Sequence, residues 1–558
     1  MKPNRNHTWA VNLHRLAAAL LLAAVVSGHS VAAPATIPPG AQDQVHQSLR
    51  VIDELSGYYR VEGKPTPPAD SQDPVVTDQT QTEALPADDE LRVYIRQIAV
   101  DASEILTPAE IAAVTAGYEE REVSIRELQT VAEQLNALYR TKNYITAKAL
   151  LPPQTIVDGI VRIQLVEGRL GQLHFSGNNH TRDYYFTNRL QLQSGGLIHL
   201  TDLERQLTGF NLANDIRVRA ELKPGAAFGT TDIVLVVQEP VNEQLSFFSD
   251  NAGSKTTGRY RYGLSYFNRS LTGNRDSLSL TPVWSKGSFS GSAFYNVAMT
   301  NGGRVGISYD RSRIDIISGQ FAHLNIEGYS NDLALHFTWP MAVRPGFRSE
   351  QSLQLHLKNS ETLFDGSKIL NTDTNTLAWE LSFQTGAERR ATLVKHGIVR
   401  GYTDDGSGNQ QFVKYTLSVV RQQAFVSGTM QTLRLNGQLT ADRSLPTVEQ
   451  FSLGGMSSVR GYPGGVGNGD KGYLISAEWT RPLSEQVMGL LFIDHGGAIP
   501  YKGAGLGETS DDFLTSVGVG LTTKFDDSNS AKLVLGFPLQ HRDEYSPRLH
   551  FVWQASLL

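Results

Sequence analysis

The sequence predicts two small α+β domains followed by an all-β transmembrane barrel of about 16 antiparallel strands. Three observations carry this prediction. A leader at the N-terminus directs the chain to export, a βααββ pattern occurs twice between residues 91 and 241, and short alternating segments fill residues 242–558. An amphipathic helix and a linker are expected between the leader and the first α+β domain.

The first 35 residues are predicted to be a secretory signal peptide. Basic residues precede an apolar run over residues 16–26, and small residues follow it. This run is too short to span a bilayer, and no later stretch of about 18 uninterrupted apolar residues occurs. The small-residue rule places cleavage after Ala32 or Ala35. The chain is therefore expected to leave the cytoplasm and to have no transmembrane helix.

Composition argues against several classes of function. The 558 residues carry a formal net charge of −6, without the basic excess typical of a nucleic-acid binder. The chain has 0 cysteines, which excludes thiol catalysis, disulfides and thiolate metal sites. Its 14 histidines are scattered, and no catalytic cluster or phosphate-binding loop stands out. We therefore expect no catalytic residue, no metal, no cofactor and no nucleic-acid partner.

Residues 36–60 are predicted to contain one short amphipathic helix. Four apolar side chains recur at helical spacing and share one face. They are Val45, Leu49, Ile52 and Leu55. A mobile tail is the alternative interpretation of this region. Residues 61–90 are rich in Pro, Asp, Gln and Thr and lack apolar periodicity, so we expect an extended linker.

Residues 91–168 are predicted to form the first α+β domain. Thr107 and Pro108 fit the N-cap and the first position of a helix. Ser124 and Glu127 form a capping box before a second, strongly periodic helix. The expected strands cover residues 91–98, 144–150 and 159–166. This βααββ unit is expected to bury one face of its sheet under two helices.

The same order of elements recurs in residues 169–241, although the two copies share negligible sequence identity. The second helix again begins with a potential capping pair, Thr201 and Glu204. The expected helices cover residues 183–192 and 201–210, and the expected strands cover residues 170–175, 216–222 and 231–238. The pattern therefore predicts an internal structural repeat.

Residues 242–558 are predicted to form the barrel. Helical periodicity is absent, and segments such as residues 352–357 and 548–557 alternate between apolar and polar side chains. About 20 residues per strand and connection suit tilted membrane strands, and an even strand number brings both barrel ends to one side. Mean hydropathy is only −0.26, as expected when half of the strand residues face a polar lumen. An array of β-sandwiches or a propeller is the alternative, but no blade repeat is found.

One glycine-rich segment differs from ordinary barrel loops. Residues 451–465 are apolar and carry a single cation, Arg460. A solvated loop usually carries several charges, so we expect this one to fold inward, with Arg460 seeking an anion in the lumen. Asp494, within an apolar strand, is the natural partner. From the residue types alone, the alternative is that Arg460 and Asp494 match only by chance and do not form a pair.

Three motifs in these regions resemble the signatures of two-partner secretion outer-membrane transporters of the haemolysin secretion-activation family. They are Leu-Gly-Gly-x-x-x-Val-Arg-Gly-Tyr ending at Tyr462, Phe-x-Asp-x-Gly starting at Phe492, and Pro-Pro-Gln after a strand. The matching residues are Val459, Arg460, Gly461 and Tyr462 in the loop, Phe492, Asp494 and Gly496 in the strand, and Pro152, Pro153 and Gln154 in the first α+β domain. The resemblance covers essentially the whole mature chain.

The resemblance implies a 16-stranded barrel in the Gram-negative outer membrane, two periplasmic POTRA domains, a pore-plugging N-terminal helix and an inward loop whose Arg460 pairs with Asp494. The implied function is export of a secreted exoprotein, of haemolysin, adhesin or contact-dependent toxin type, without nucleotide hydrolysis. Outer-membrane lipid and, during biogenesis, the barrel assembly machinery are the other implied partners. The alternative is an outer-membrane protein insertase of the barrel-assembly or translocation-and-assembly type. The final residue, Leu558, departs from the terminal Phe common in such barrels.

Overall fold

The computed structural model describes residues 75–78, 92–406, 408–441, 445–500, 512–540 and 544–558. The predicted signal peptide and the predicted helix with Val45, Leu49, Ile52 and Leu55 lie outside these residues. Within the described ranges, no helix is both long enough and apolar enough to cross a membrane.

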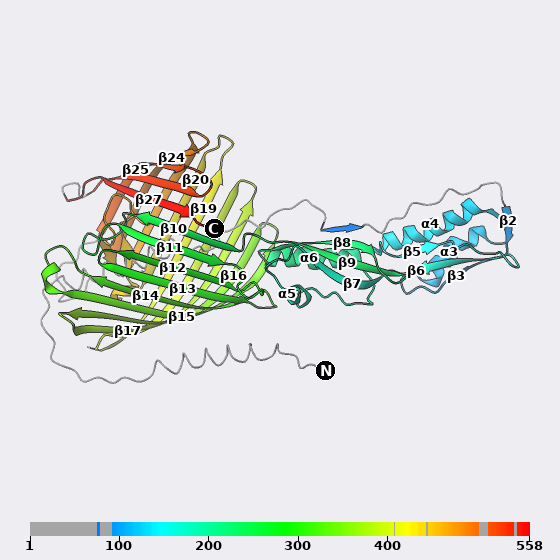
Figure 1. The fold of residues 1–558 in the computed structure, drawn as a ribbon, viewed down its shortest axis with the longest axis horizontal. Coiled ribbons are helices and arrows are strands. Elements are labelled where there is room, and N and C mark those ends of the chain that lie inside the picture. Colours follow the sequence, from blue (N-terminus) through cyan, green and yellow to red (C-terminus); the bar gives the residue numbers. More distant parts are fainter. Residues whose placement is uncertain (1–74, 79–91, 407, 442–444, 501–511, 541–543) are drawn as a thin grey trace. The chain divides into compact units, whose positions relative to one another are not determined.

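Sixteen antiparallel strands form a closed barrel, which confirms the predicted fold class (Figure 1). The strands follow one another around the barrel in sequence order, and the last pairs with the first. They are β10 (Glu243–Asp250), β11 (Arg261–Asn268), β12 (Ser277–Ser285), β13 (Ser288–Ala298), β14 (Arg304–Asp315), β15 (Ile326–Arg344), β16 (Phe347–Phe364), β17 (Ser367–Ala387), β18 (Arg390–Asp404), β19 (Asn409–Ala424), β20 (Met430–Thr440), β23 (Lys471–Pro482), β24 (Val487–Ile499), β25 (Asp512–Lys524), β26 (Asn529–Pro538) and β27 (Arg548–Ser556). Because their number is even, the chain enters and leaves the barrel at the same end.

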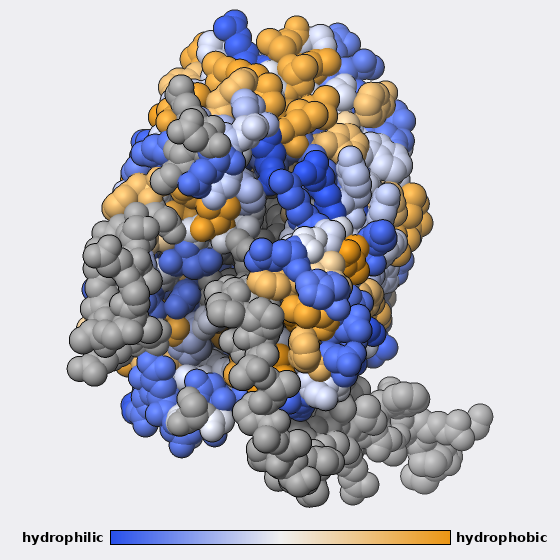
Figure 2. All heavy atoms as spheres, turned by 90° about the vertical axis from the view of Figure 1, so that its left-hand side faces the viewer, coloured by the Kyte–Doolittle hydropathy of each residue, from blue (hydrophilic) through white to orange (hydrophobic). Residues whose placement is uncertain are grey.

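The barrel strands reverse the burial pattern of a water-soluble sheet. In β12 the side chains of Ser279 and Thr281 are buried, whereas those of Leu280 and Trp284 are each 37% exposed. Small polar residues therefore face the lumen, and apolar residues face outward, the pattern expected of a barrel that lipid surrounds. Figure 2 views one end of the barrel, where hydrophilic residues gather around the middle of the face.

The barrel wall is uneven. β10 has 8 residues, whereas β15, β16 and β17 have 19, 18 and 21. About 9–11 tilted residues cross a membrane, so the strands from β15 to β19 continue beyond the lipid-facing band.

The first α+β domain packs two helices on a three-stranded sheet of order β3-β6-β5. Its elements are β2 (Arg92–Ile95), β3 (Gln97–Val100), α3 (Pro108–Thr115), the 3-10 turn η2 (Ala116–Tyr118), β4 (Arg121–Ser124), α4 (Ile125–Thr141), β5 (Lys148–Leu150) and β6 (Ile160–Val166). The single strand expected over residues 91–98 is in fact two, because β2 leaves the sheet and pairs with β4.

Both helices of this domain begin where their capping residues predict. The side chains of Thr107 and Ser124 accept hydrogen bonds from the backbone N–H groups of Glu110 and Glu127. In return, the side chain of each glutamate accepts a hydrogen bond from the backbone N–H of its capping residue. Hydrogen bonds from the Thr107 backbone and from the ammonium of Lys142 lower the pKa of Glu110 to about 2. The caps therefore fix the starts of α3 and α4.

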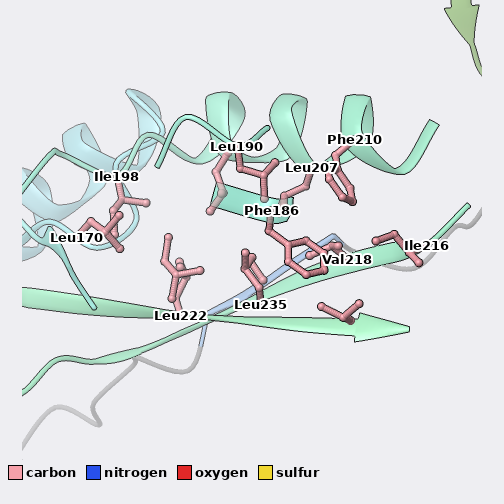
Figure 3. Close-up of a cluster of buried hydrophobic side chains, with 14 of the residues drawn as sticks. Leu170, Phe186, Leu190, Ile198, Leu207, Phe210, Ile216, Val218, Leu222 and Leu235 are labelled. Carbon is pink, nitrogen blue, oxygen red and sulfur yellow. The ribbon is translucent and has the colours of Figure 1, made fainter. Parts of the chain in front are cut away.

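The second α+β domain contains β7 (Arg169–Ser176), α5 (Asp183–Thr187), α6 (Leu200–Ala213), β8 (Arg217–Pro224) and β9 (Thr230–Gln238). Its core lies between the helices and the sheet and includes Phe186, Leu207 and Leu235 (Figure 3). The predicted capping pair of α6 is wrong, because Thr201 already lies inside the helix. The side chain of His199 caps the helix instead, by accepting a hydrogen bond from the backbone N–H of Asp202.

One short strand within the Pro-rich segment joins the second domain. β1 (Val76–Asp78) pairs in parallel with β8 and extends the sheet to the order β1-β8-β9-β7. The Ala220 N–H donates to the carbonyl oxygen of Val75 over 2.9 Å. Val75 and Val76 also pack against the domain core. The edge of β8 is therefore covered by the chain itself at these positions.

Candidate functional site: the inward loop

The segment between β20 and β23 folds as a hairpin of its own. It contains the 3-10 turn η4 (Thr447–Glu449) and two short strands, β21 (Phe451–Leu453) and β22 (Gly467–Gly469), which pair antiparallel. Leu453, Val459 and Tyr462 are fully buried in a cluster with side chains of β23, β24 and β25. The loop therefore lies against the inner wall of the barrel, as its apolar composition predicts.

Four glycines of this loop have positive φ angles that other residues rarely adopt, and two of them also lie very close to neighbouring backbone. Gly454 and Gly461 have φ angles of 94° and 99°. A Cβ atom at Gly454 would lie 2.1 Å from the carbonyl oxygen of Pro463, and one at Gly461 would lie 3.1 Å from the carbonyl carbon of Gly536. The glycine density thus permits the turns of the tip and its close approach to β26.

Arg460 is the centre of a buried group of side chains that we name the tip cluster. Its Nε and Nη2 donate to the two carboxylate oxygens of Asp494 over 2.8 and 2.9 Å, and its Nη1 donates to Glu478 over 2.6 Å. The guanidinium carbon lies 3.6 Å from the centre of the Phe492 ring. Ser476 donates to Asp494 over 2.7 Å. Asp494 is 0% exposed and Arg460 is 5% exposed, so the pair is desolvated and fully hydrogen-bonded.

The other residues of the two barrel motifs surround this cluster. The Tyr462 hydroxyl donates to the carbonyl oxygens of Thr515 and Gln540, each over 3.0 Å. Gly496 leaves room for the loop, because a Cβ there would lie 2.6 Å from the side chain of Leu453. Val459 is fully buried beside them. The motif residues of the loop and of β24 thus meet at one place.

Sequence reasoning missed Glu478 and a second set of contacts at the loop base. Glu478 faces the lumen two positions after Ser476 on β23, and Ser476 is the register partner of Asp494. The base cluster, as we name it, consists of Glu449 with Lys358 of β16 and Lys414 of β19, at 2.8 and 2.9 Å. The sequence signal for the base cluster was Glu449, an acidic residue directly before an apolar loop. Its partners could not be identified from the sequence, because Lys358 and Lys414 lie far from it in the chain.

Pro152, Pro153 and Gln154 belong to the first α+β domain. The side-chain amide of Gln154 donates to the carbonyl oxygen of Arg162 and accepts from its N–H, both over 2.8 Å. The side chain thereby continues the pairing between β5 and β6 after the prolines interrupt it. This motif completes a sheet edge.

The side chains of the inward loop hold the loop in place and are not arranged to form or break covalent bonds. Its charged group, Arg460, pairs with Asp494 and Glu478. The described residues include no group of three or more His, Asp or Glu side chains placed to hold a metal ion. Buried ion pairs of this kind fix one arrangement of a segment, and separating them leaves uncompensated charge. These contacts therefore hold the loop in one position against the inner wall of the barrel.

The two α+β domains, the closed barrel and the internal loop define an outer-membrane protein transporter with POTRA domains. The chain matches the family model described as haemolysin secretion/activation protein ShlB/FhaC/HecB over residues 229–523, and the ShlB-type POTRA domain over residues 93–168. The chain therefore belongs to the ShlB/FhaC/HecB family of haemolysin secretion/activation proteins. It is an outer-membrane transporter of a secreted exoprotein and not an enzyme.

Relatives and solved structures agree with this assignment. The heme/hemopexin transporter protein HuxB of Haemophilus influenzae (strain 86-028NP) is 26% identical over 502 residues, covering 84% of this chain and 87% of HuxB. The outer membrane transporter CdiB of Dickeya dadantii is 23% identical, covering 73% of this chain and 76% of CdiB. The structure of CdiB from Acinetobacter baumannii has a TM-score of 0.61 at 15% identity, covering 94% of this chain and 100% of CdiB.

The insertase alternative is not favoured by these comparisons. BamA from Haemophilus ducreyi, lacking POTRA domains 1–3, has a TM-score of 0.51 at 13% identity, covering 84% of this chain and 100% of that one. A likeness at this level shows a shared barrel fold. The family match instead assigns the chain to the secretion transporters.

Proposed function

We propose that the inward loop closes the pore of this transporter until an exoprotein arrives from the periplasm, and that the bond between Arg460 and Asp494 holds the loop in place. The buried tip cluster is the observation that carries this proposal. Removing one partner of a buried ion pair costs about 3–5 kcal/mol, because the other charge stays behind without compensation. Such a bond holds the loop firmly but can be exchanged for other contacts.

The exoprotein first meets the POTRA domains. An unfolded chain can add a strand to an exposed sheet edge, where main-chain hydrogen bonds give affinity with few demands on side chains. It then passes through the barrel lumen without nucleotide hydrolysis, and its folding outside the cell gives the movement its direction. Relatives of this chain are named as hemolysin and heme/hemopexin transporter proteins, and by analogy the exported partner is a secreted protein.

The remaining regions have supporting roles in this scheme. The scheme assigns the role of plug helix to residues 36–60, which lie outside the described residues, and that of linker to residues 61–90. It assigns residues 91–168 and 169–241 to the POTRA domains and residues 242–558 to the barrel. Outer-membrane lipid surrounds the apolar outer face, and the barrel assembly machinery inserts the chain.

The test is secretion of the partner exoprotein by cells that produce wild type, Arg460→Ala or Asp494→Ala. We expect secretion to fall about tenfold or more, since a half-pair costs about 3–5 kcal/mol. Arg313→Ala is the matched control, because Arg313 pairs with Asp315 but is 50% exposed. Barrel abundance and heat-modifiability are measured in parallel. Unchanged secretion by folded Arg460→Ala and Asp494→Ala barrels would contradict the proposal.

A further inference from the structure

The inward loop is fastened to the barrel wall at two separate places. The tip cluster binds it to β23 and β24. At the base, Glu449 is only 4% exposed, and its two carboxylate oxygens contact Lys358 on β16 and Lys414 on β19. Two strands, β17 and β18, separate β16 from β19 in the barrel. The Glu449 carboxylate therefore connects strands that are not neighbours, from inside the lumen.

Main-chain contacts strengthen the same attachment. The carbonyl oxygen of Glu449 accepts hydrogen bonds from the ammonium of Lys414 and from Nε2 of Gln438, each over 2.9 Å. Gln438 lies on β20 and also donates to the carbonyl oxygen of Asp470 over 3.1 Å. Since Glu449 and Asp470 belong to the two arms of the loop, Gln438 holds both arms at their origin.

The lumen beside this attachment is hollow and polar. A cavity of about 300 Å³ is bounded by Val448 of the loop and by strands from β14 to β17, with serine, threonine and histidine side chains in its lining. A second cavity of about 220 Å³ is lined by Glu449, both lysines and Glu380. Hydroxyl and amide groups of this kind offer hydrogen bonds to a passing main chain without holding it in a fixed register. The loop base therefore forms part of the lining of two polar cavities.

The two clusters differ in how strongly they hold. Arg460 makes a bidentate contact and lies over an aromatic ring, geometries that an arginine fork supports. The lysines of the base cluster make point contacts, and the side chain of Lys358 is 25% exposed. Water reaches the base cluster more readily than the tip cluster, and exposure weakens an ion pair. Of the two attachments, the base is the easier to release.

We propose that Glu449 is a positioning residue for export: its contacts with Lys358 and Lys414 hold the loop base across the lumen, and their release widens the passage along β14–β19 while the tip stays bound. The inference rests on the proposed closure of the pore by the loop. In this scheme the base cluster controls the width of the pore, and the tip cluster keeps the loop attached to the barrel wall.

The first experiment compares ion conductance of the purified full chain in planar lipid bilayers. We expect Glu449→Gln to raise the mean conductance severalfold, because the amide no longer attracts the two lysines. Glu380→Gln is the matched control. Glu380 lines the same cavity and pairs with Lys395 of the wall, so this change removes an equal lumenal charge without touching the loop. Glu449→Asp, which keeps the charge, should restore part of the wild-type closure.

A second measurement locates the widening. Because the chain has 0 cysteines, a single Ser360→Cys change places one label site in the lining of the larger cavity. In the Glu449→Gln background this cysteine should react with maleimides of larger size than in the parent barrel. If Glu449→Gln does not fold, Lys358→Met and Lys414→Met, each of which leaves Glu449 one partner, replace it in both measurements.

The outcomes separate this inference from the proposed function. Equal conductance and labelling in Glu449→Gln and wild type would overturn it, and so would an equal rise in Glu380→Gln, which would show a general effect of lumenal charge. If Arg460→Ala opens the pore while Glu449→Gln does not, the loop closes the pore without control at its base. If neither opens it, the proposed closure itself fails.

Discussion

Gln154 shows how one side chain can replace a segment of backbone. The two preceding prolines have no N–H groups and cannot extend β5, yet Arg162 on β6 still has both its backbone groups paired, through the Gln154 amide. An amide is the side-chain group that donates and accepts in this manner. The Pro-Pro-Gln motif therefore closes a sheet edge that would otherwise be open to other strands.

Gln154→Ala is expected to destabilise this edge by about 1–3 kcal/mol, since each of two hydrogen bonds contributes roughly 0.5–1.5 kcal/mol. Gln154→Glu keeps the acceptor but places a carboxylate oxygen against the carbonyl of Arg162, so it should not restore stability. Hydrogen exchange at the Arg162 amide measures the effect, and protection as strong in Gln154→Ala as in wild type would contradict it.

The tip cluster was partly predictable from the sequence, and the base cluster was not. A single cation in an apolar, glycine-dense segment indicates a buried partner, and the motif resemblance identifies Asp494 as that partner. Glu478 and Lys358 lie on strands whose register with the loop no local pattern reveals. Lys358 and Glu449 are 91 residues apart, and only closure of the barrel brings them together.

At the scale of elements, local chemistry fixed helix starts better than strand partners. The starts of α3 and α4 were predicted because an N-cap followed by Pro, or a capping box, is contained in at most four consecutive residues. The expected start of α6 at Thr201 was wrong because His199 took the capping role. β1 was not predicted at all, since three residues in a Pro-rich segment carry no periodicity and pair only because β8 offers an edge.

β1 occupies an edge that an incoming strand could use, so weakening β1 should make β8 more accessible. Thr77→Pro removes an N–H from β1, and the exposed side chain contributes nothing to the core. We expect faster hydrogen exchange along β8 and tighter binding of the partner exoprotein. Thr77→Ala is the control, and unchanged exchange in Thr77→Pro would show that β1 does not protect this edge.

At the scale of the whole molecule, the number and order of barrel strands were predictable because each strand alternates over a membrane-sized length. The unequal lengths of the strands were harder to predict from the sequence. Residues 358–362 of β16 and 371–376 of β17 are polar on both faces, so the alternating pattern that marks a membrane strand is lost there.

The proposed plug region gives a prediction for the complete transporter. Deletion of residues 41–60 should raise ion conductance, because it removes the helix expected to fill part of the pore. Replacing the same residues with a Gly-Ser segment of equal length controls for chain length. Conductance equal to that of wild type in both variants would exclude a gating role for this region.

The barrel closes through five residue pairs between β10 and β27, whereas β16 and β17 share eighteen. The side chain of Asn251 lengthens this contact by bonding the backbone of Leu549 and Phe551. These partners are about 300 residues apart in the chain, so bringing them together has a large entropic cost. We therefore expect the two ends to join late in folding. A barrel that has not yet closed exposes two strand edges that other chains can bind.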